Sequence, residues 1–314
     1  MSKTKIIVGG IGGVGGFFGG LLAKHYQRSD KVEIIFLARG SHLEAIQKNG
    51  LRVKKGAEAF TAIPALATDD PIKAGIADFI LLCTKSYDLE STIQQLGPSI
   101  GPKTVILPLL NGVDSRTRIL ALLPETHVLH GCVYIVSRLT APGHIENIGN
   151  IQTLYFGLDG RIDLKSSVLE KTLADAGIEA KCTSAISDII WEKYTFISPT
   201  AAATTYFDSC IGELLADEHK KRILELLIAE VQGIATAKNI NLPQDIVGKT
   251  IEKLQKLPFD MTSSMHHDFQ QHKEKNELDT LCTYVVSDAQ KHQLPCPTFQ
   301  MVLSKLSNNS ISKN

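Results

Sequence analysis

The sequence has no excess of charge of either sign and no long apolar run. Its 314 residues contain 33 Lys and Arg against 33 Asp and Glu, so no net field would attract nucleic acid or an anionic membrane. The longest apolar runs, such as residues 79–83 and 105–110, are far too short to cross a bilayer. Lys3 and Lys5 lead directly into the first apolar run, which leaves no room for a signal peptide. We therefore expect a soluble, cytoplasmic enzyme without nucleic-acid or membrane partners.

Paired cysteines are also missing. The six cysteines are scattered with no C-x-x-C pair, which predicts reduced, structural thiols. Cys83 follows an apolar run and is expected to be a core thiol rather than a nucleophile. The metal-ligand residue types His266, His267, Asp268 and His272 lie close together in the sequence, but only Asp268 and His272 have helical i,i+4 spacing. We expect a polar helix face there and no metal.

The chain has two halves of different pattern. Up to about residue 184, short β-rich runs alternate with helical stretches, which favours an α/β, Rossmann-type doubly wound parallel sheet with helices on both faces. These runs lie at residues 51–53, 79–84, 105–108, 127–137 and 154–157. Long helical segments then follow, at residues 189–205, 211–238, 247–257, 265–293 and 298–306. We expect a nucleotide-binding domain over residues 1–184 and an all-α domain over residues 185–314.

A glycine cluster follows the first apolar strand. The run Gly10-Ile11-Gly12-Gly13-Val14-Gly15 fits the pattern G-x-G-x-x-G and precedes a helical stretch and a second strand at residues 32–38. In this fingerprint one glycine permits the tight turn, the second lets the backbone approach a pyrophosphate, and the third lets the helix pack against the strand. The anion would lie on free N–H groups at the helix N-terminus. The cluster predicts a dinucleotide site.

The residue after the second strand indicates which dinucleotide would bind. An NAD site normally has Asp or Glu at this point, which accepts from the ribose hydroxyls, whereas this chain has Arg39. A guanidinium suits a 2′-phosphate, so the sequence predicts NADP, bound as NADPH. The alternative is a glycine-rich turn followed by an ordinary surface arginine. Strand, glycines, helix, strand and basic residue all occur in order, which favours the nucleotide site.

Two polar residues follow later strands of the expected sheet. Lys85 comes after the run at residues 79–84, and Asn111 comes after residues 105–110. Parallel sheets bind ligands outside the carboxyl ends of their strands, so both residues are expected at the cofactor edge. Lys85 could approach a ribose or the substrate, and Asn111 has a donor and an acceptor for ribose and substrate. A solvated lysine and an Asn-Gly turn remain equally good interpretations.

Three residues of the second half are candidates for chemistry on a carbonyl. Lys193 is expected at the start of one helix and Ser264 at the start of another, with Glu277 well along that second helix. A lysine that protonates a carbonyl needs a suitable environment and an orienting partner, and a serine at a helix N-terminus binds carboxylates well. Taken singly, these residues are more simply a surface lysine, an N-cap and a solvated glutamate.

Taken together, these residues resemble the ketopantoate reductase (2-dehydropantoate 2-reductase) family over nearly the full chain. The matching elements are Gly10–Gly16, Leu37-Ala38-Arg39-Gly40, Lys85, Asn111-Gly112, Trp191-Glu192-Lys193, Ser263-Ser264-Met265-His266-His267-Asp268, Glu277-Leu278-Asp279 and Leu294-Pro295-Cys296-Pro297. The resemblance implies NADPH-dependent reduction of a 2-oxo acid to a 2-hydroxy acid. By family resemblance the substrate is ketopantoate, which is reduced to pantoate in pantothenate (vitamin B5) and coenzyme A biosynthesis.

The resemblance also implies a role for each site residue. Lys193 would be the general acid, Ser264 would hold the substrate, and Asn111 would touch both substrate and cofactor. Glu277 would bind near the nicotinamide ribose and help to orient Lys193. Arg39 and Lys85 would hold the cofactor. The small-molecule substrate is the expected partner, and a homodimer is left open.

Three positions depart from the family pattern. Ile197 and Ala201 stand four and eight residues after Lys193, and Met261 precedes the serine pair, where the family commonly has asparagines. Ile197 would then line a more apolar substrate pocket that lacks ligands for a hydroxyl, which should alter specificity more than catalysis. The alternatives are a reductase of a less hydroxylated 2-oxo acid or of an imine, and a non-catalytic NADP-binding sensor. A sensor would not need the proton donor Lys193.

Overall fold

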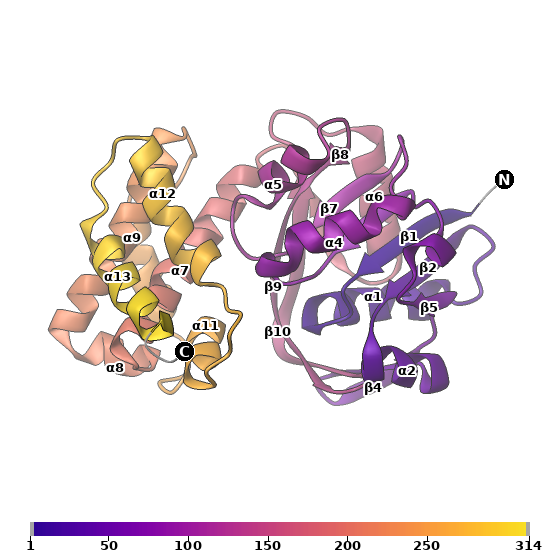
Figure 1. The fold of residues 1–314 in the computed structure, drawn as a ribbon, viewed down its shortest axis with the longest axis horizontal. Coiled ribbons are helices and arrows are strands. Elements are labelled where there is room, and N and C mark those ends of the chain that lie inside the picture. The colour runs from indigo at the N-terminus through magenta and orange to yellow at the C-terminus, as the bar shows by residue number, and fades with distance from the viewer. Residues whose placement is uncertain (1–2, 312–314) are drawn as a thin grey trace. The chain divides into compact units, whose positions relative to one another are not determined.

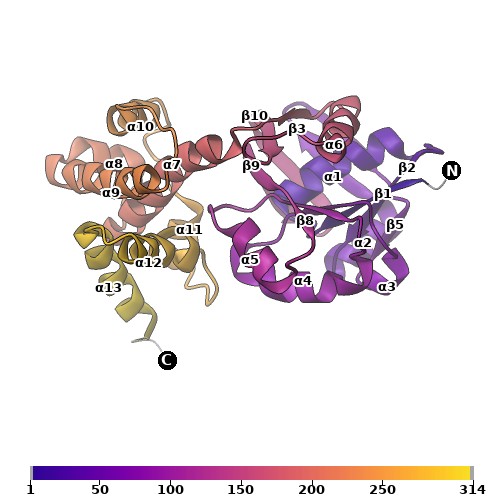
Figure 2. The same cartoon turned by 90° about the horizontal axis from the view of Figure 1, so that it is seen from above.

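The computed structural model describes the backbone of residues 3–311, with all of their side chains except those of residue 150 and residues 308–311. The chain forms two compact units, one ending at Ile186 and the other beginning at Ser187 (Figures 1 and 2). The sequence placed this boundary between residues 184 and 185. Among the described residues, no helix is both long enough and apolar enough to cross a membrane.

The first unit is built on a six-stranded sheet in which all neighbouring strands are parallel. Its strands, in spatial order, are β5 (Leu66–Thr68), β2 (Val32–Leu37), β1 (Thr4–Gly9), β6 (Phe79–Leu82), β7 (Val105–Pro108) and β8 (His127–Val128). The order steps outward from β1 in both directions, as in doubly wound dinucleotide-binding sheets. The predicted Rossmann-type fold is confirmed.

Both faces of this sheet are buried, because side chains of β1 alternate between two cores. Ile7 packs with Ile93 and Ile119 from α4 (Leu89–Leu96) and α5 (Ser115–Leu122). Ile6 packs on the other face with Phe17 from α1 (Gly13–Tyr26). Burying successive side chains on opposite faces explains why parallel strands read as continuous apolar runs. The remaining helices of the unit are α2 (Gly40–Asn49), α3 (Pro71–Ala74) and α6 (Leu164–Asp175).

A second, mixed sheet covers α1, and the sequence did not predict it. Its strands are β3 (Leu51–Lys55), β4 (Glu58–Ala62), β9 (His130–Ala141), β10 (His144–Gly157) and β11 (Glu179–Cys182). The expected strand over residues 127–137 is therefore wrong: it divides into β8, which joins the parallel sheet, and β9, which pairs antiparallel with β10. Helix α1 lies between the two sheets, since its buried side chains share a core with both.

The second unit is helical throughout its regular elements, as predicted. These are α7 (Ile186–Phe207), α8 (Ile211–Ala216), α9 (Glu218–Ala237), α10 (Ile246–Gln255), α11 (Ser264–Gln270), a π-helical turn η3 (Asp279–Thr283), α12 (Tyr284–Lys291) and α13 (Pro297–Ile311).

Two expected helices are interrupted. The segment 211–238 breaks at Asp217, whose carboxylate accepts from the Lys220 N–H and caps α9. The segment 265–293 breaks after α11, where His272 has a φ of +52°. A helix cannot continue through a left-handed residue of this kind, so α11 ends and a new helical segment begins near residue 278.

Candidate functional site

The strand register of the parallel sheet brings the predicted cofactor residues of this unit to one edge. Gly9 pairs with Leu82, and Leu82 pairs with Pro108, so β1, β6 and β7 end at the same level. The chain after these strands carries the glycine turn, Lys85 and Asn111, and Arg39 follows the end of β2. Ligands of doubly wound sheets bind at this edge.

The three glycines of the fingerprint differ in the local structure that favours glycine at each position. Gly10 has a φ of +92°, which allows the turn after β1. A Cβ on Gly15 would lie 2.0 Å from the Gly10 carbonyl oxygen, so only glycine lets α1 pack so closely. At Gly12, the N-cap of α1, a Cβ would meet nothing within 4 Å. An open position beside the first N–H groups of a helix fits a pyrophosphate, and we find this cradle suited to a dinucleotide.

His42, on α2, fixes the glycine turn and was missed in the sequence. The Gly143 N–H donates to its Nδ1 at 2.8 Å, so Nε2 bears the proton and donates to the Ile11 carbonyl at 2.7 Å. Burial lowers the pKa of His42, which keeps the ring neutral in this role. The histidine thus ties the glycine turn to the loop between β9 and β10. The sequence offered no signal beyond its position three residues after Arg39.

Two exposed basic residues, Arg39 and Lys85, lie at the edge of the sheet that carries the glycine turn. Arg39 is the N-cap residue of α2, and its Nη2 donates to the side-chain oxygen of Gln95 on α4. Lys85 precedes the short 3₁₀ turn η1 (Ser86–Asp88) that leads into α4. Exposed basic side chains at this edge are suited to contact an anionic ligand.

An ion pair that the sequence did not reveal connects α4 and α5, the helices that follow Lys85 and Asn111. Arg118, on α5, donates from Nε and Nη2 to the two carboxylate oxygens of Glu90, at 2.7 and 2.8 Å. The same Nη2 donates to the Ser86 carbonyl at 2.8 Å. Hydrogen bonds from Arg118 hold the pKa of Glu90 below its usual range. The guanidinium joins η1 to the helix that follows Asn111.

In the second unit, α7 carries Lys193 but does not begin there. The helix begins at Ile186, two turns earlier, so the expected position of Lys193 at a helix start is wrong. Lys193 is partly buried, and Ile197 and Ala201 follow it at four-residue intervals on the same helix face. This face combines one ammonium with two apolar side chains.

Glu277 is not on the helix that begins at Ser264, contrary to expectation. It lies after the break that follows α11, two residues before η3, and its side chain is only 2 % exposed. A carboxylate at this depth needs polar or cationic partners. Two bonds hold its segment against α7: the Tyr194 hydroxyl donates to the Thr280 carbonyl, and the Ser198 hydroxyl donates to the Leu281 carbonyl, each at 2.6 Å. Lys193 and Glu277 therefore belong to neighbouring elements.

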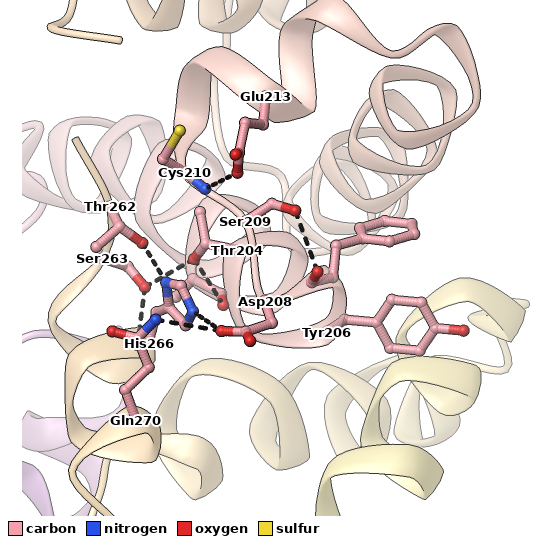
Figure 3. Close-up of polar contacts among 12 residues, drawn as sticks. Thr204, Tyr206, Asp208, Ser209, Cys210, Glu213, Thr262, Ser263, His266 and Gln270 are labelled. Carbon is pink, nitrogen blue, oxygen red and sulfur yellow. Dashed lines mark hydrogen bonds and ion pairs between the residues drawn. The ribbon is translucent and has the colours of Figure 1, made fainter. Parts of the chain in front are cut away.

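Ser264 is exposed at the first residue of α11, and its neighbours are fixed to the end of α7 (Figure 3). Ser263, not Ser264, is the N-cap, and its Oγ accepts from the His266 N–H at 3.1 Å. The Ser263 and Thr204 hydroxyls are hydrogen-bonded to each other at 2.8 Å. The exposed hydroxyl of Ser264 thus stands on an anchored turn.

His266 is buried and does not lie on a polar helix face, which corrects the expectation for residues 266–272. Its Nε2 bonds Asp208 Oδ1 at 2.7 Å, and its Nδ1 bonds the Thr262 hydroxyl at 2.6 Å (Figure 3). Asp268 is also buried, and its carboxylate accepts from Lys273 at 2.6 Å. Within residues 3–311, no cluster of three or more His, Cys, Asp or Glu side chains is arranged to hold a metal ion.

Cys83 is partly exposed, and its side chain packs against the core, in line with the expected packing role. Its burial raises the pKa to about 12, so it is not ionised near neutral pH. Its Cβ is one of the atoms that a Cβ on Gly15 would meet, at 2.8 Å. The thiol belongs to the packing under the glycine turn.

Comparisons with known proteins agree over almost the whole chain. A family model described as ketopantoate reductase PanE/ApbA matches residues 6–160, and the model of the C-terminal part of that family matches residues 185–309. An uncharacterized oxidoreductase of Bacillus subtilis is 27% identical, over 96% of this chain and 97% of its own. The 2-dehydropantoate 2-reductase of Halobacterium salinarum is 26% identical, over 94% and 95%. The solved structure of 2-dehydropantoate 2-reductase from Porphyromonas gingivalis has a TM-score of 0.85 and 36% identity, covering 97% of this chain and 99% of that one.

Proposed function

The chain belongs to the ketopantoate reductase family, and from this premise we propose that it reduces ketopantoate to pantoate with NADPH. It is an oxidoreductase with a dinucleotide-binding fold, and its family reduces small 2-oxo acids. The observation that carries the proposal in the structure is the open position at Gly12, beside the N-terminus of α1 and at the same sheet edge as Arg39. The guanidinium of Arg39 supports a 2′-phosphorylated cofactor.

The roles proposed for the binding residues follow from their chemistry. The backbone of residues 10–15 would hold the pyrophosphate, while Arg39 and Lys85 would neutralise the phosphates. Asn111, after β7, has both a donor and an acceptor for the ribose and the substrate. The exposed hydroxyl of Ser264 would bind the substrate carboxylate.

The proposed reaction places one proton and one hydride on the substrate carbonyl. NADPH supplies the hydride when bound. Lys193 donates its Nζ proton to the carbonyl oxygen as negative charge develops there, and the neutral amine recovers a proton from solvent. Glu277 is proposed to hold the Lys193 ammonium and to bind near the nicotinamide ribose. Its burial supports this role, because a fixed carboxylate orients its partner better than a solvated one.

The substrate is tested with two 2-oxo acids that differ by one hydroxyl. NADPH oxidation is measured against ketopantoate and 3,3-dimethyl-2-oxobutanoate, which lacks only the 4-hydroxyl, and each reaction is repeated with NADH. Under this proposal, groups other than Ile197, Ala201 and Met261 bond the 4-hydroxyl. We then expect kcat/KM to be at least tenfold higher for ketopantoate, since a site that bonds a hydroxyl rejects the analogue without it. We also expect NADPH to be preferred over NADH.

The alternative is a less hydroxylated 2-oxo acid, and a specific observation favours it. Ile197 and Ala201 share the helix face of Lys193, and neither can bond a substrate hydroxyl. Met261, ahead of the serine pair, cannot bond one either. A kcat/KM that is equal or higher for the analogue would replace ketopantoate with this class. NADPH binding without oxidation by any 2-oxo acid would instead indicate a sensor and would contradict the proposal.

A further inference from the structure

The turn that follows Glu277 has a different hydrogen-bond pattern from the helices around it. Residues Asp279–Thr283 are π-helical, and the Tyr284 N–H donates to the Asp279 carbonyl, five residues back. In an α-helix the same N–H would donate to the carbonyl four residues back, that of Thr280. π-Helical turns are rare and occur frequently at functional sites.

The Thr280 carbonyl is instead bonded by a side chain from α7. The Tyr194 hydroxyl donates to it at 2.6 Å, and four residues further along α7 the Ser198 hydroxyl donates to the Leu281 carbonyl at 2.6 Å. Tyr194 is 1 % exposed and Ser198 is fully buried, so water cannot replace these donors. Satisfying a buried carbonyl in this way removes the cost that would otherwise oppose the π-helical turn.

The turn connects directly to the proposed catalytic residues. Tyr194 is adjacent to Lys193 on α7, and the Leu281 N–H donates to the Glu277 carbonyl at 2.9 Å. If the turn became α-helical, the chain on one side would shift by one residue, about 100° of rotation and 1.5 Å of rise. Such a shift would carry the Glu277 carboxylate away from its present position.

We propose that Tyr194, assisted by Ser198, is a positioning residue that keeps residues 279–283 π-helical and thereby sets Glu277 relative to Lys193. The inference rests on the proposed function, in which Lys193 donates a proton and Glu277 orients it. Tyr194 itself does not touch the reacting atoms.

The test removes the Tyr194 hydroxyl and compares the effect on catalysis with that of removing a neighbouring hydroxyl. In Tyr194→Phe we expect kcat to fall roughly ten- to a hundredfold, since displacement of a catalytic group by about 1 Å has effects of this size. KM for the 2-oxo acid should change less than kcat, and the pH profile of kcat should move because Lys193 has lost its oriented partner. A purely structural role would not move that profile.

Tyr284→Phe is the matched control. The ring of Tyr284 packs edge-to-face on Tyr194, with centroids 6.1 Å apart, and its hydroxyl donates to Asp288 Oδ2 at 3.1 Å. Asp288 keeps its ion pair with Lys238, at 3.0 Å. We expect wild-type kcat and a wild-type pH profile for this variant. An equal loss in both variants, or no loss in Tyr194→Phe, overturns the proposal.

A structural readout separates this inference from the proposed function. Amide hydrogen exchange across residues 279–285 should quicken in Tyr194→Phe and in the smaller change Ser198→Ala, and stay unchanged in Tyr284→Phe. If the wild type reduces no 2-oxo acid, the proposed function fails, while unchanged exchange in Tyr194→Phe overturns the positioning role by itself. Should Tyr194→Phe not fold, the Ser198→Ala variant decides by the same kcat and exchange measurements.

Discussion

At the scale of single residues, the proposed chemistry depends on Lys193. Proton transfer from a positioned acid contributes about 10²–10⁴-fold, so Lys193→Ala should lower kcat by that factor and leave NADPH affinity nearly unchanged. Glu277→Ala should lower kcat and also weaken NADPH binding, because both roles are proposed for it. The measurements are steady-state rates and a fluorescence titration with NADPH. A folded Lys193→Ala protein that turns over at the wild-type rate would exclude this lysine, and Lys85 would become the acid to test.

Several side chains that support the site could not be predicted from the sequence. His42 bonds the backbone of Gly143, Arg118 bonds Glu90, and Tyr194 bonds the carbonyl of Thr280. Each partner lies far along the chain, and no local spacing encodes such a bond. Gly10, Arg39, Lys85 and Asn111 could be placed because a parallel sheet brings its strand ends to one edge.

At the scale of elements, the glycines of α1 allow this helix to pack closely against the mixed sheet, which was not predicted from the sequence. A Cβ on Gly13 would lie 2.1 Å from the Ser137 carbonyl oxygen on β9, and one on Gly16 would lie 2.5 Å from the Ile145 side chain on β10. These glycines face the mixed sheet, while Gly15 faces the parallel one. The fingerprint accounts for only part of the glycine run. The rest lets α1 pack between two sheets, which only the three-dimensional structure reveals.

Helix α1 allows packing and binding to be separated with two substitutions. Gly12→Ala enters open space at a φ of −83°, so stability should change by less than about 1 kcal/mol while NADPH affinity falls. Gly15→Ala would drive a Cβ against the Gly10 carbonyl and the Cys83 side chain, and should lower stability by roughly 2 kcal/mol or more. Denaturant unfolding and NADPH titration measure the two effects. Equal loss of stability in both variants would contradict the separate roles given to these glycines.

Helix boundaries in the second unit were harder to predict than helix content. Residues 211–238 have leucines at helical spacing, yet the chain breaks at Asp217, which ends one helix and whose carboxylate caps the next. The break after α11 depends on the left-handed backbone of His272, a residue type that the sequence pattern does not exclude from a helix. Periodicity therefore predicted which segments are helical, while capping and backbone conformation decided where each one ends.

At the scale of the whole molecule, partly buried histidines should make stability depend on pH. Burial and the nearby charge of Arg116 lower the pKa of His130 to about 4, and burial also lowers the pKa of His42 and of His127. All three belong to the first unit. Between the unfolded pKa near 6.5 and these lower values, the unfolded chain binds more protons than the folded one. The stability of the first unit should therefore be greatest above pH 6.5 and should fall as the pH drops.

The size of this effect can be assigned to His130. Lowering its pKa from 6.5 to about 4 corresponds to a loss of up to about 3 kcal/mol as the pH falls through that window. Glutamine cannot be protonated in this pH range. In His130→Gln, the fall in the free energy of unfolding between pH 7 and pH 4.5 should therefore be smaller than in the wild type. The difference should be somewhat less than about 3 kcal/mol, because pH 4.5 does not reach the folded pKa of about 4. Amide exchange of the β1 and β6 segments, measured at both pH values, follows the first unit alone. The carboxylates with lowered pKa, such as Asp163, are present in both proteins, so their contribution cancels when the variant is compared with the wild type. The same pH dependence in the variant and the wild type would show that His130 is not the group being titrated.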